Sequence, residues 1–189
     1  MSAGKNTLRI IGGEYRGRRM PFANIPGLRP TADRVRETLF NWLQGEVTGR
    51  RVLDLFAGSG ALGIEALSRG AAEVVLVEKA YPAVQQLRKN LEGLKALEHS
   101  CVEPMDALAY LQTVQKPFFD IVFLDPPFAD SLLPETCAAL QASGCLTARA
   151  WVYLEQSVSQ DWPDLPVTWQ IYRESQAGQV RFCLCRYQG

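Results

Sequence analysis

The sequence predicts an α/β protein built on a mostly parallel, seven-stranded sheet, and three observations support this fold class. From residue 51 onward, short apolar runs alternate with segments of helical periodicity, as in βαβ units. The first apolar run ends in a glycine turn followed by helix-forming residues, which is typical of the opening of a doubly wound sheet. The last two runs, 167–174 and 179–187, alternate around a turn and predict an antiparallel hairpin that closes the sheet edge.

The N-terminal part of the chain lies outside this pattern. Residues 8–11 and 14–20 are expected to form a small β-hairpin with arginines alternating on one face, followed by a proline-containing linker. Thr31 is expected to cap a helix whose apolar residues recur at i, i+4, i+7 and i+8. We therefore divide the 189 residues into a basic arm with its linker, 1–30, and one domain, 31–189, made of a helix (31–47), a cofactor-binding core (51–155) and a C-terminal hairpin (167–187).

The core is expected to alternate regularly between strands and helices. The expected strands are 51–56, 73–78, 101–103, 119–124 and 151–155. The expected helices are 61–67, 81–96, 108–114 and 132–140. The second of these helices has Pro82 in its first turn and a stripe at Val84, Leu87, Leu91 and Leu94 that predicts its buried face.

The first core strand runs into the sequence DLFAGSG, which begins at Asp54. Gly58, Gly60 and Gly63 also satisfy the dinucleotide pattern GxGxxG, so an oxidoreductase has to be considered beside a simple tight turn. Asp54, four residues before the first glycine, favours S-adenosylmethionine, because a carboxylate repels a pyrophosphate but can hold the methionine ammonium. Glu78 ends the next strand and suits the two ribose hydroxyls of either cofactor.

The fourth core strand runs into Asp125, Pro126, Pro127 and Phe128. The prolines fix φ and bring carbonyls without competing N–H donors. The Asp125 carboxylate and the Pro126 carbonyl can then accept both hydrogens of one exocyclic base amine and aim its lone pair at a methyl donor. Phe128 offers a ring on which the base can stack. An ordinary turn is the alternative, but the earlier glycine loop favours methylation of a nucleobase nitrogen.

Composition excludes several other classes of protein. The chain has no apolar stretch of 18 residues and no apolar run near its N-terminus, so we expect a cytoplasmic protein without a membrane partner. Its five cysteines lack a CxxC pair and predict reduced, mostly buried thiols. His99 is the only histidine, which argues against a catalytic histidine relay or a Cys/His metal site, so no metal is expected.

Charge is distributed unevenly along the chain. The net charge is zero, yet residues 1–51 carry ten Lys or Arg against four Asp or Glu, which is +6 and leaves −6 on the remainder. A basic segment on an otherwise acidic domain predicts a polyanionic substrate approached from one side. Solvated surface charge is the alternative, but Arg16, Arg18 and Arg19 cluster beside glycines instead of spreading over a helix.

With these residues identified, the sequence closely resembles the bacterial RsmD-type 16S rRNA guanine-N2 methyltransferases. The matching blocks are RIIGGEYRGRRM (9–20), LRPTADRVRETLFNWL (28–43), DLFAGSGALGIEALSRGA (54–71) and VFLDPPF (122–128). The resemblance covers essentially the whole chain. It implies a Rossmann-like class I methyltransferase fold and transfer of a methyl group from S-adenosylmethionine to the exocyclic amine of one guanine. It also implies 16S rRNA within a partly or fully assembled small ribosomal subunit as the substrate, and we expect a monomer.

The matched motifs imply roles for individual residues. The methionine end of the cofactor would lie against Asp54, Gly58 and Gly60, and the ribose against Glu78. Asp106 either receives the adenine amine or caps the helix that follows, and members of the family often have Asn there. The full cofactor set is Asp54, Phe56, Ala57, Gly58, Ser59, Gly60, Glu78, Lys79, Asp106, Ala107 and Asp125. The base clamp is Asp125, Pro126, Pro127 and Phe128, and the RNA-binding set is Arg9, Arg16, Arg18, Arg19, Arg29, Thr31, Arg34 and Arg36.

Two other functions share part of this pattern. A DNA methyltransferase acting on adenine N6 or cytosine N4 would have both core motifs, but such enzymes usually need a sizeable recognition domain, and only about 50 residues here precede the core. A non-catalytic RNA-binding module could keep the fold. The intact carboxylates Asp54, Glu78 and Asp125 argue against that second alternative.

Overall fold

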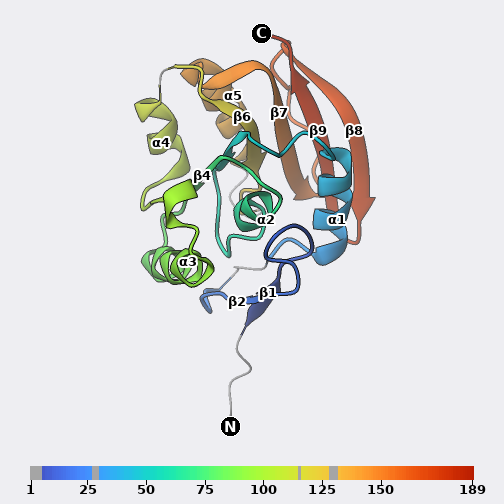
Figure 1. Ribbon diagram of the computed structural model, residues 1–189. Helices are drawn as coiled ribbons and strands as arrows, with labels where there is room; N and C mark the ends of the chain where they lie inside the picture. Colours follow the sequence, from blue (N-terminus) through green and yellow to red (C-terminus); the bar gives the residue numbers. More distant parts are fainter. Residues whose placement is uncertain (1–5, 27–29, 115, 128–131) are drawn as a thin grey trace.

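The computed structural model describes residues 6–26, 30–114, 116–127 and 132–189, and these include the expected seven-stranded sheet (Figure 1). The strand order is β5-β4-β3-β6-β7-β9-β8. Neighbours from β5 to β7 pair in parallel, whereas β9 runs antiparallel to both β7 and β8. The strands are β3 Arg51–Asp54, β4 Glu73–Val77, β5 Ser100–Glu103, β6 Phe119–Leu124, β7 Leu146–Ser157, β8 Trp169–Ala177 and β9 Val180–Tyr187. The predicted fold class, terminal hairpin included, is confirmed.

The strand order reverses at β3. The chain moves from β3 outward to β4 and β5, then returns to place β6 on the other side of β3. In open α/β sheets, ligands bind outside the carboxyl ends of the strands at such a reversal. Asp54 is the last residue of β3, and Asp125 directly follows β6, so both predicted motifs lie at this point.

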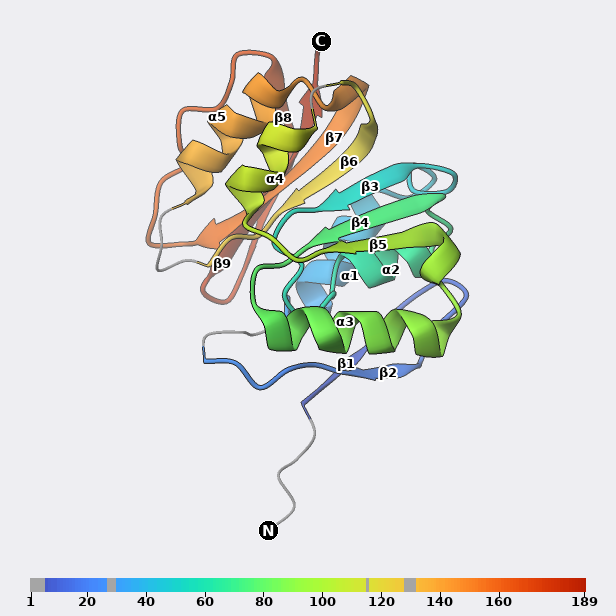
Figure 2. The ribbon, with the colours of Figure 1, turned by 90° about the vertical axis from the view of Figure 1, so that its left-hand side faces the viewer.

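Helices cover both faces of the sheet (Figure 2). One face packs against α1 Asp33–Trp42, α2 Gly63–Ser68 and α3 Tyr81–Leu94, and the other against α4 Ala107–Thr113 and α5 Leu133–Ser143. Because side chains alternate along a strand, Val52 belongs to the first core and Leu53 to the second. The predicted stripe of α3 is buried in the first core, and its Pro82 lies in the first turn, as expected.

The N-terminal hairpin is shorter than predicted. Only β1 Thr7–Arg9 and β2 Arg19–Pro21 pair, and residues 10–18 connect them, so a strand over 14–20 is wrong for most of that range. The backbone N–H of Glu14 donates to the Ser68 carbonyl at 2.7 Å, and that of Tyr15 donates to the Ser68 hydroxyl at 2.9 Å. The connection is therefore docked on the end of α2 instead of extending a hairpin.

The two predicted helix caps have different outcomes. Asp106 does cap α4, since its Oδ1 accepts from the backbone N–H groups of Leu108 and Ala109. Thr31 does not cap α1, because the N-cap is Ala32 and the Thr31 hydroxyl binds elsewhere. α1 also ends at Trp42, earlier than the expected 47.

Two further findings concern thiols and helices. Cys137, Cys145, Cys183 and Cys185 are buried and Cys101 is exposed, and all five are free thiols, as predicted. In the described parts of the chain, every helix is too short or too polar to cross a bilayer.

Candidate active site

The candidate site is formed where β3 and β6 end side by side. Asp54 is aligned with Phe123 of β6, so Asp125 lies just beyond it at the same sheet edge. The two carboxylates belong to segments about 70 residues apart, and the parallel pairing of their strands brings them together. The glycine loop that leaves β3 and the Asp125-Pro126-Pro127 segment that leaves β6 therefore lie next to each other.

The glycine loop needs glycine at Gly60. Its φ of +81° is left-handed, and a Cβ there would come within 2.7 Å of Ile64 and Leu87 side chains. Gly58 also has a positive φ, of 51°. The loop is anchored on β4, because the Ala57 N–H donates to the Val77 carbonyl at 2.9 Å. These contacts give the loop a fixed backbone against which a ligand can lie closely.

Asp54 is a buried acid with a perturbed pKa. It is 2% exposed, and its Oδ2 accepts from the Gly63 backbone N–H at 2.9 Å. Burial raises the pKa of Asp54 to about 7, the Gly63 hydrogen bond opposes the rise, and the charges of Asp125 and Glu78 add to it. Asp54 thus lies among like charges, which is a place where a cationic ligand group is favoured.

Glu78 binds the backbone of the glycine loop and also faces the candidate site. Its Oε2 accepts from the Gly58 N–H at 2.9 Å, and its Oε1 accepts from the Ala80 N–H at 2.7 Å. The side chain therefore links the glycine loop to the start of α3. Lys79 beside it is exposed, whereas Ala107 is buried under the exposed Asp106 at the start of α4. The ribose and adenine contacts stay predictions.

Asp125 is held by a residue from the N-terminal region. The Thr31 hydroxyl donates to Asp125 Oδ2 at 3.0 Å. Burial raises the pKa of Asp125 to about 6, and the hydrogen bond from Thr31 works against that rise. Pro126 is buried and Pro127 exposed, while Phe128, the predicted stacking ring, lies outside the described residues. Among the expected clamp residues, the structure thus places Asp125 and Pro126 at the sheet edge beside Asp54.

A second carboxyl group beside Asp125 was missed by the sequence analysis. Leu124 of β6 is aligned with Leu154 of β7, so Glu155 follows next to Asp125. Glu155 is 4% exposed and accepts from the Tyr153 hydroxyl at 2.6 Å. Burial and the Asp125 charge raise the pKa of Glu155 to about 9, so the two neighbouring carboxyl groups oppose each other's ionisation. The signal available in the sequence was the acid Glu155 at the end of the apolar run 151–155.

The predicted RNA-binding residues fall into two groups. Arg9, Arg16, Arg18, Arg19 and Arg34 are exposed, whereas Arg29 lies outside the described residues. Arg36 is 0% exposed, with its guanidinium bonded to Asp33, Glu65 and two carbonyls. This corrects the expected RNA contact of Arg36, because a fully buried guanidinium cannot reach a phosphate. The Thr31 hydroxyl is directed at Asp125, and an RNA contact of Thr31 stays a prediction.

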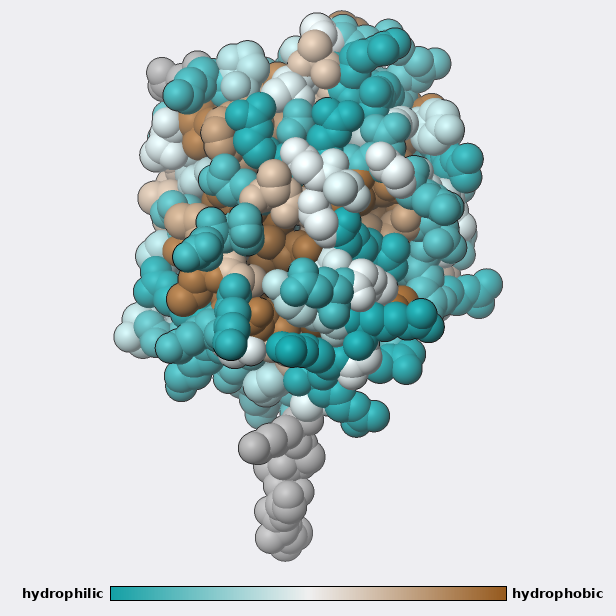
Figure 3. Space-filling view, in the orientation of Figure 1, coloured by the Kyte–Doolittle hydropathy of each residue, from teal (hydrophilic) through white to brown (hydrophobic). Residues whose placement is uncertain are grey.

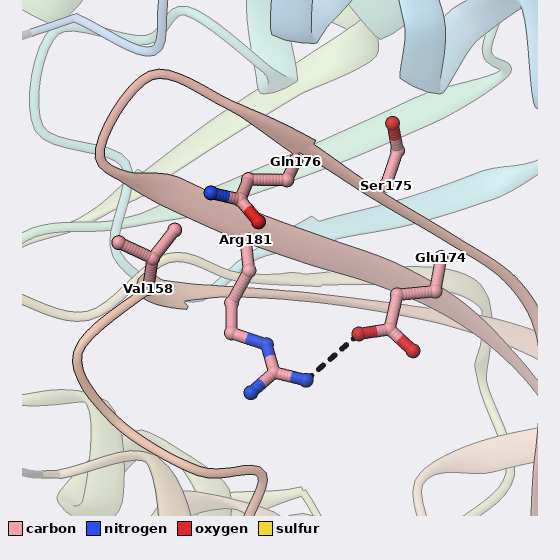
Figure 4. A pocket seen from close by; sticks show the side chains of 5 residues that line it. All are labelled: Val158, Glu174, Ser175, Gln176 and Arg181. Carbon is pink, nitrogen blue, oxygen red and sulfur yellow. Dashed lines mark hydrogen bonds and ion pairs between the residues drawn. The ribbon is translucent and has the colours of Figure 1, made fainter.

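Two surface hollows lie near charged side chains. One of about 360 Å³ lies between the N-terminal hairpin and α1 and is lined in part by Arg9, Arg19 and Thr31. The other, of about 430 Å³, lies on the C-terminal hairpin, where Arg181 reaches toward Glu174 and bonds to it at 2.8 Å (Figure 4). Of the predicted site residues that the structure describes, none lines the second hollow. The first adjoins the candidate site through Thr31.

The fold is that of a Rossmann-like class I methyltransferase. Its strand order and terminal antiparallel hairpin are typical of that class, as is a glycine loop that follows an acid, here Asp54. Solved structures of similar proteins share this fold. A putative methyltransferase from Escherichia coli superposes with a TM-score of 0.90 at 44% identity, over 97% of this chain and 99% of that one. A putative methylase from Haemophilus influenzae gives 0.84 at 38% identity, over 97% and 100%. A putative methyltransferase complexed with SAH shares the fold at 14% identity, with a TM-score of 0.65, over 81% and 48%.

Sequence comparison identifies the family. The family described as "Conserved hypothetical protein 95" matches residues 8–186. The Escherichia coli (strain K12) protein named ribosomal RNA small subunit methyltransferase D is 48% identical over 96% of this chain and 91% of its own length. A Haemophilus influenzae protein of the same name is 43% identical over 95% of this chain and 94% of its own length. The chain belongs to this RsmD family, and the resemblance seen in its motifs is confirmed.

Proposed function

We propose that the protein transfers a methyl group from S-adenosylmethionine to the exocyclic N2 amine of a guanine in 16S rRNA of the small ribosomal subunit. The observation that carries the proposal is the adjacency of the Asp54 glycine loop and the Asp125-Pro126-Pro127 segment at the reversal point of the sheet. The relatives' name, small subunit rRNA methyltransferase, supports the choice of RNA. The guanine N2 position rests on the resemblance to the RsmD-type enzymes.

The residues around Asp54 fit the proposed cofactor. Burial and then the carboxylates of Asp125 and Glu78 raise the pKa of Asp54, so a bound cation would relieve the repulsion among these charges. S-adenosylmethionine has an ammonium and supplies, when bound, an electrophilic methyl group on a sulfonium, and after transfer it would leave as S-adenosylhomocysteine. We place the methionine end against Asp54 and the Phe56–Gly60 loop (residues 56–60), the ribose against Glu78 and Lys79, and the adenine against Asp106 and Ala107. No group of three metal-ligating side chains occurs within the described ranges.

The acceptor amine would be held by the base clamp. A guanine amine has its lone pair delocalised into the ring, so it must be oriented before it can attack. The Asp125 carboxylate and the Pro126 carbonyl would receive its two hydrogens and stabilise the positive charge that develops on nitrogen. The methylated nitrogen then loses a proton easily because it is strongly acidic, so Asp125 need not be a strong base.

The exposed arginines of the N-terminal region would bring the RNA to this site. Arg9, Arg16, Arg18 and Arg19 lie on or between β1 and β2, and Arg9 and Arg19 line the hollow that reaches Thr31. Their positive charge attracts phosphates whatever the sequence, so they position the substrate and leave base recognition to the clamp. We propose a cytoplasmic monomer whose substrate is an assembled or assembling small subunit.

Methyl transfer from tritium-labelled S-adenosylmethionine tests this proposal. Small subunits, naked 16S rRNA and duplex DNA are offered in parallel, and labelled nucleosides are identified after digestion. We expect label in N2-methylguanosine, with small subunits as the best substrate. Label in adenine or cytosine of DNA would establish the amino-methyltransferase of DNA instead. RNA binding without label in any substrate would point to the non-catalytic module.

A further inference from the structure

The base clamp depends on a residue far away in the sequence. Thr31 lies 94 residues before Asp125, yet its hydroxyl donates to Asp125 Oδ2 at 3.0 Å. Thr31 is only 7% exposed, so water competes little for this bond. A threonine hydroxyl on a carboxylate is a charge-assisted hydrogen bond, which is stronger than a neutral one. The contact therefore has the geometry and the burial to fix the orientation of the carboxylate.

Thr31 is itself held in place by Arg36. The Arg36 Nε donates to the Thr31 carbonyl at 3.2 Å, and its Nη2 donates to the Arg9 carbonyl at 2.9 Å. The same guanidinium contacts Glu65 on α2 at 3.5 Å. Glu65 in turn accepts from the backbone N–H groups of Ile11 and Gly12. Thr31 thus sits at the end of a buried network that joins the N-terminal region to the helix following the glycine loop.

We infer that Thr31 is a positioning residue for methyl transfer, whose hydroxyl sets the rotamer of Asp125 and directs its other oxygen, Oδ1, at the acceptor amine. The inference rests on the proposed function, because it assigns Asp125 the role of holding that amine. It adds that the carboxylate of the clamp is held by a residue that precedes α1, outside the β6 segment. Thr31 would act through Asp125 and need not touch the substrate.

The same bond also affects the charge of Asp125. Thr31 donates to the ionised form and so lowers the pKa of Asp125 against the effect of burial. The titratable groups facing Asp125 are Asp54 from β3 together with Tyr153 and Glu155 from β7. All of these are acids, so none supplies a positive charge that would stabilise an ionised Asp125, and the Tyr153 hydroxyl already donates to Glu155. Removing the hydroxyl should therefore raise the pKa of Asp125.

The decisive variant is Thr31→Val, which replaces the hydroxyl by a methyl group and keeps the backbone carbonyl that Arg36 holds. Single-turnover methyl transfer is measured with saturating S-adenosylmethionine and small subunits, from pH 5 to 9. We expect a rate about ten- to a hundredfold lower. The acid limb of the pH–rate profile should move to higher pH, because the ionised Asp125 is the active form. Thr31→Ser, which keeps the hydroxyl, should restore both the rate and the acid limb.

Thr38→Val is the matched control. Thr38 lies on α1, and its hydroxyl donates to the Arg34 carbonyl at 2.9 Å on the exposed side, so wild-type rates are expected. Should Thr31→Val not fold, Thr31→Ala removes the same hydroxyl with a smaller side chain. Its single-turnover rate and the acid limb of its pH–rate profile are then compared with those of the wild type. A folded Thr31 variant with a rate within twofold of wild type and an unmoved acid limb would overturn the inference.

Asp125→Ala separates this inference from the proposed function. If Asp125→Ala is inactive while Thr31→Val behaves as wild type, the base clamp stands and the role of Thr31 is wrong. If Asp125→Ala itself transfers methyl groups within a few-fold of wild type, the clamp fails and the inference falls with it. Cofactor affinity is measured for each variant by calorimetry, and an unchanged value excludes loss of the glycine loop as the cause of a lower rate.

Discussion

At the scale of single residues, the candidate site is organised by buried acids that raise one another's pKa. Burial and the Asp125 charge raise the pKa of Glu155. Burial also raises the pKa of Asp125, against the hydrogen bond from Thr31. Asp54 lies on the other side of Asp125 from Glu155 and has a pKa of about 7, close to neutral pH. Proton occupancy at Asp54 is therefore the most sensitive to a charged ligand.

This leads to a prediction about cofactor binding and pH. A cationic ligand favours the ionised form of Asp54, so binding should lower its pKa below about 7 and release a proton. Affinity should then weaken as the pH falls from 7 to 5.5, a range in which the ligand ammonium stays charged. Calorimetry with S-adenosylmethionine in buffers of different ionisation enthalpy measures the protons released.

The control for this prediction is Asp54→Asn, which keeps the shape of the side chain and removes its charge. We expect its affinity to be about ten- to a hundredfold lower at pH 7 and nearly independent of pH, because a charge-assisted hydrogen bond is worth roughly 1.5–3 kcal/mol. Wild-type affinity in a folded Asp54→Asn protein would show that the ammonium binds elsewhere.

Which residues could be found from sequence depends on whether their role is local. Asp54 and Asp106 were identified because each lies at a fixed place relative to its own strand or helix. The contact between Thr31 and Asp125 was not, because it joins segments 94 residues apart and depends on how α1 packs. Arg36 was misplaced for the same reason. Its charge is visible in the sequence, but its burial against Glu65 is a tertiary property.

At the scale of elements, periodicity predicted the helices and strands that pack on the sheet. α3 was expected at 81–96 and is found at Tyr81–Leu94, since its apolar stripe repeats over several turns. The segment 14–20 was wrongly expected to be a strand. Its alternating pattern is short, and docking on α2 overrides it: the Glu14 N–H donates to the Ser68 carbonyl. Tertiary contacts outweigh propensity most easily in such short segments.

The docking of this connection on α2 yields a prediction about two of its glycines. Gly13 and Gly17 both have positive φ, of 76° and 84°. A Cβ on Gly13 would lie 1.7 Å from the Ser68 carbonyl oxygen, whereas one on Gly17 meets nothing within 4 Å. Gly17→Ala should therefore lose about 1–2 kcal/mol of unfolding free energy from backbone strain alone. Gly13→Ala should lose clearly more, because its backbone must also move away from α2.

Urea unfolding of the wild type and the two variants measures this difference. Gly17→Ala is the matched control, since it introduces the same methyl group at a similar φ on the same connection. Gly13→Ala should also weaken the hydrogen bonds of Glu14 and Tyr15 to Ser68, which proton exchange of those two amides would report. Equal free energies of unfolding in the two variants would show that the close approach to Ser68 does not exist in solution.

At the scale of the whole molecule, the N-terminal region is joined to the domain by buried contacts and still presents its charge to solvent. Glu65 holds the backbone of Ile11 and Gly12 from within, while Arg16, Arg18 and Arg19 are exposed. The lower part of Figure 3, where Figure 1 places β1 and β2, is largely hydrophilic, with small hydrophobic patches between polar side chains. We propose residues 1–30 as a basic unit, whose described part, 6–26, is attached to the domain by these contacts and would hold a bound RNA at a fixed distance from Asp125.

The last prediction tests this charge as an RNA contact. Replacing Arg16 and Arg19 together by Gln should weaken binding of small subunits and reduce the slope of log K against log salt. Each lost phosphate contact should lower the slope by about 0.7–0.9, so the double variant should lose about 1.4–1.8. Affinity for S-adenosylmethionine should not change, because neither arginine contributes a contact to the glycine loop. Equilibrium binding at several salt concentrations measures the slope.

Arg149 and Arg173, replaced together by Gln, are the matched control for this experiment. Both arginines are exposed and lie outside the N-terminal region, on β7 and β8. Their replacement removes the same net charge as that of Arg16 and Arg19. Their salt slope should equal that of the wild type, because direct phosphate contacts release counterions and distant charges do so only weakly. Equal losses in both double variants would mean that overall charge alone attracts the RNA. A slope that is unchanged in the Arg16 and Arg19 variant would mean that the basic residues of the N-terminal region do not touch the phosphates.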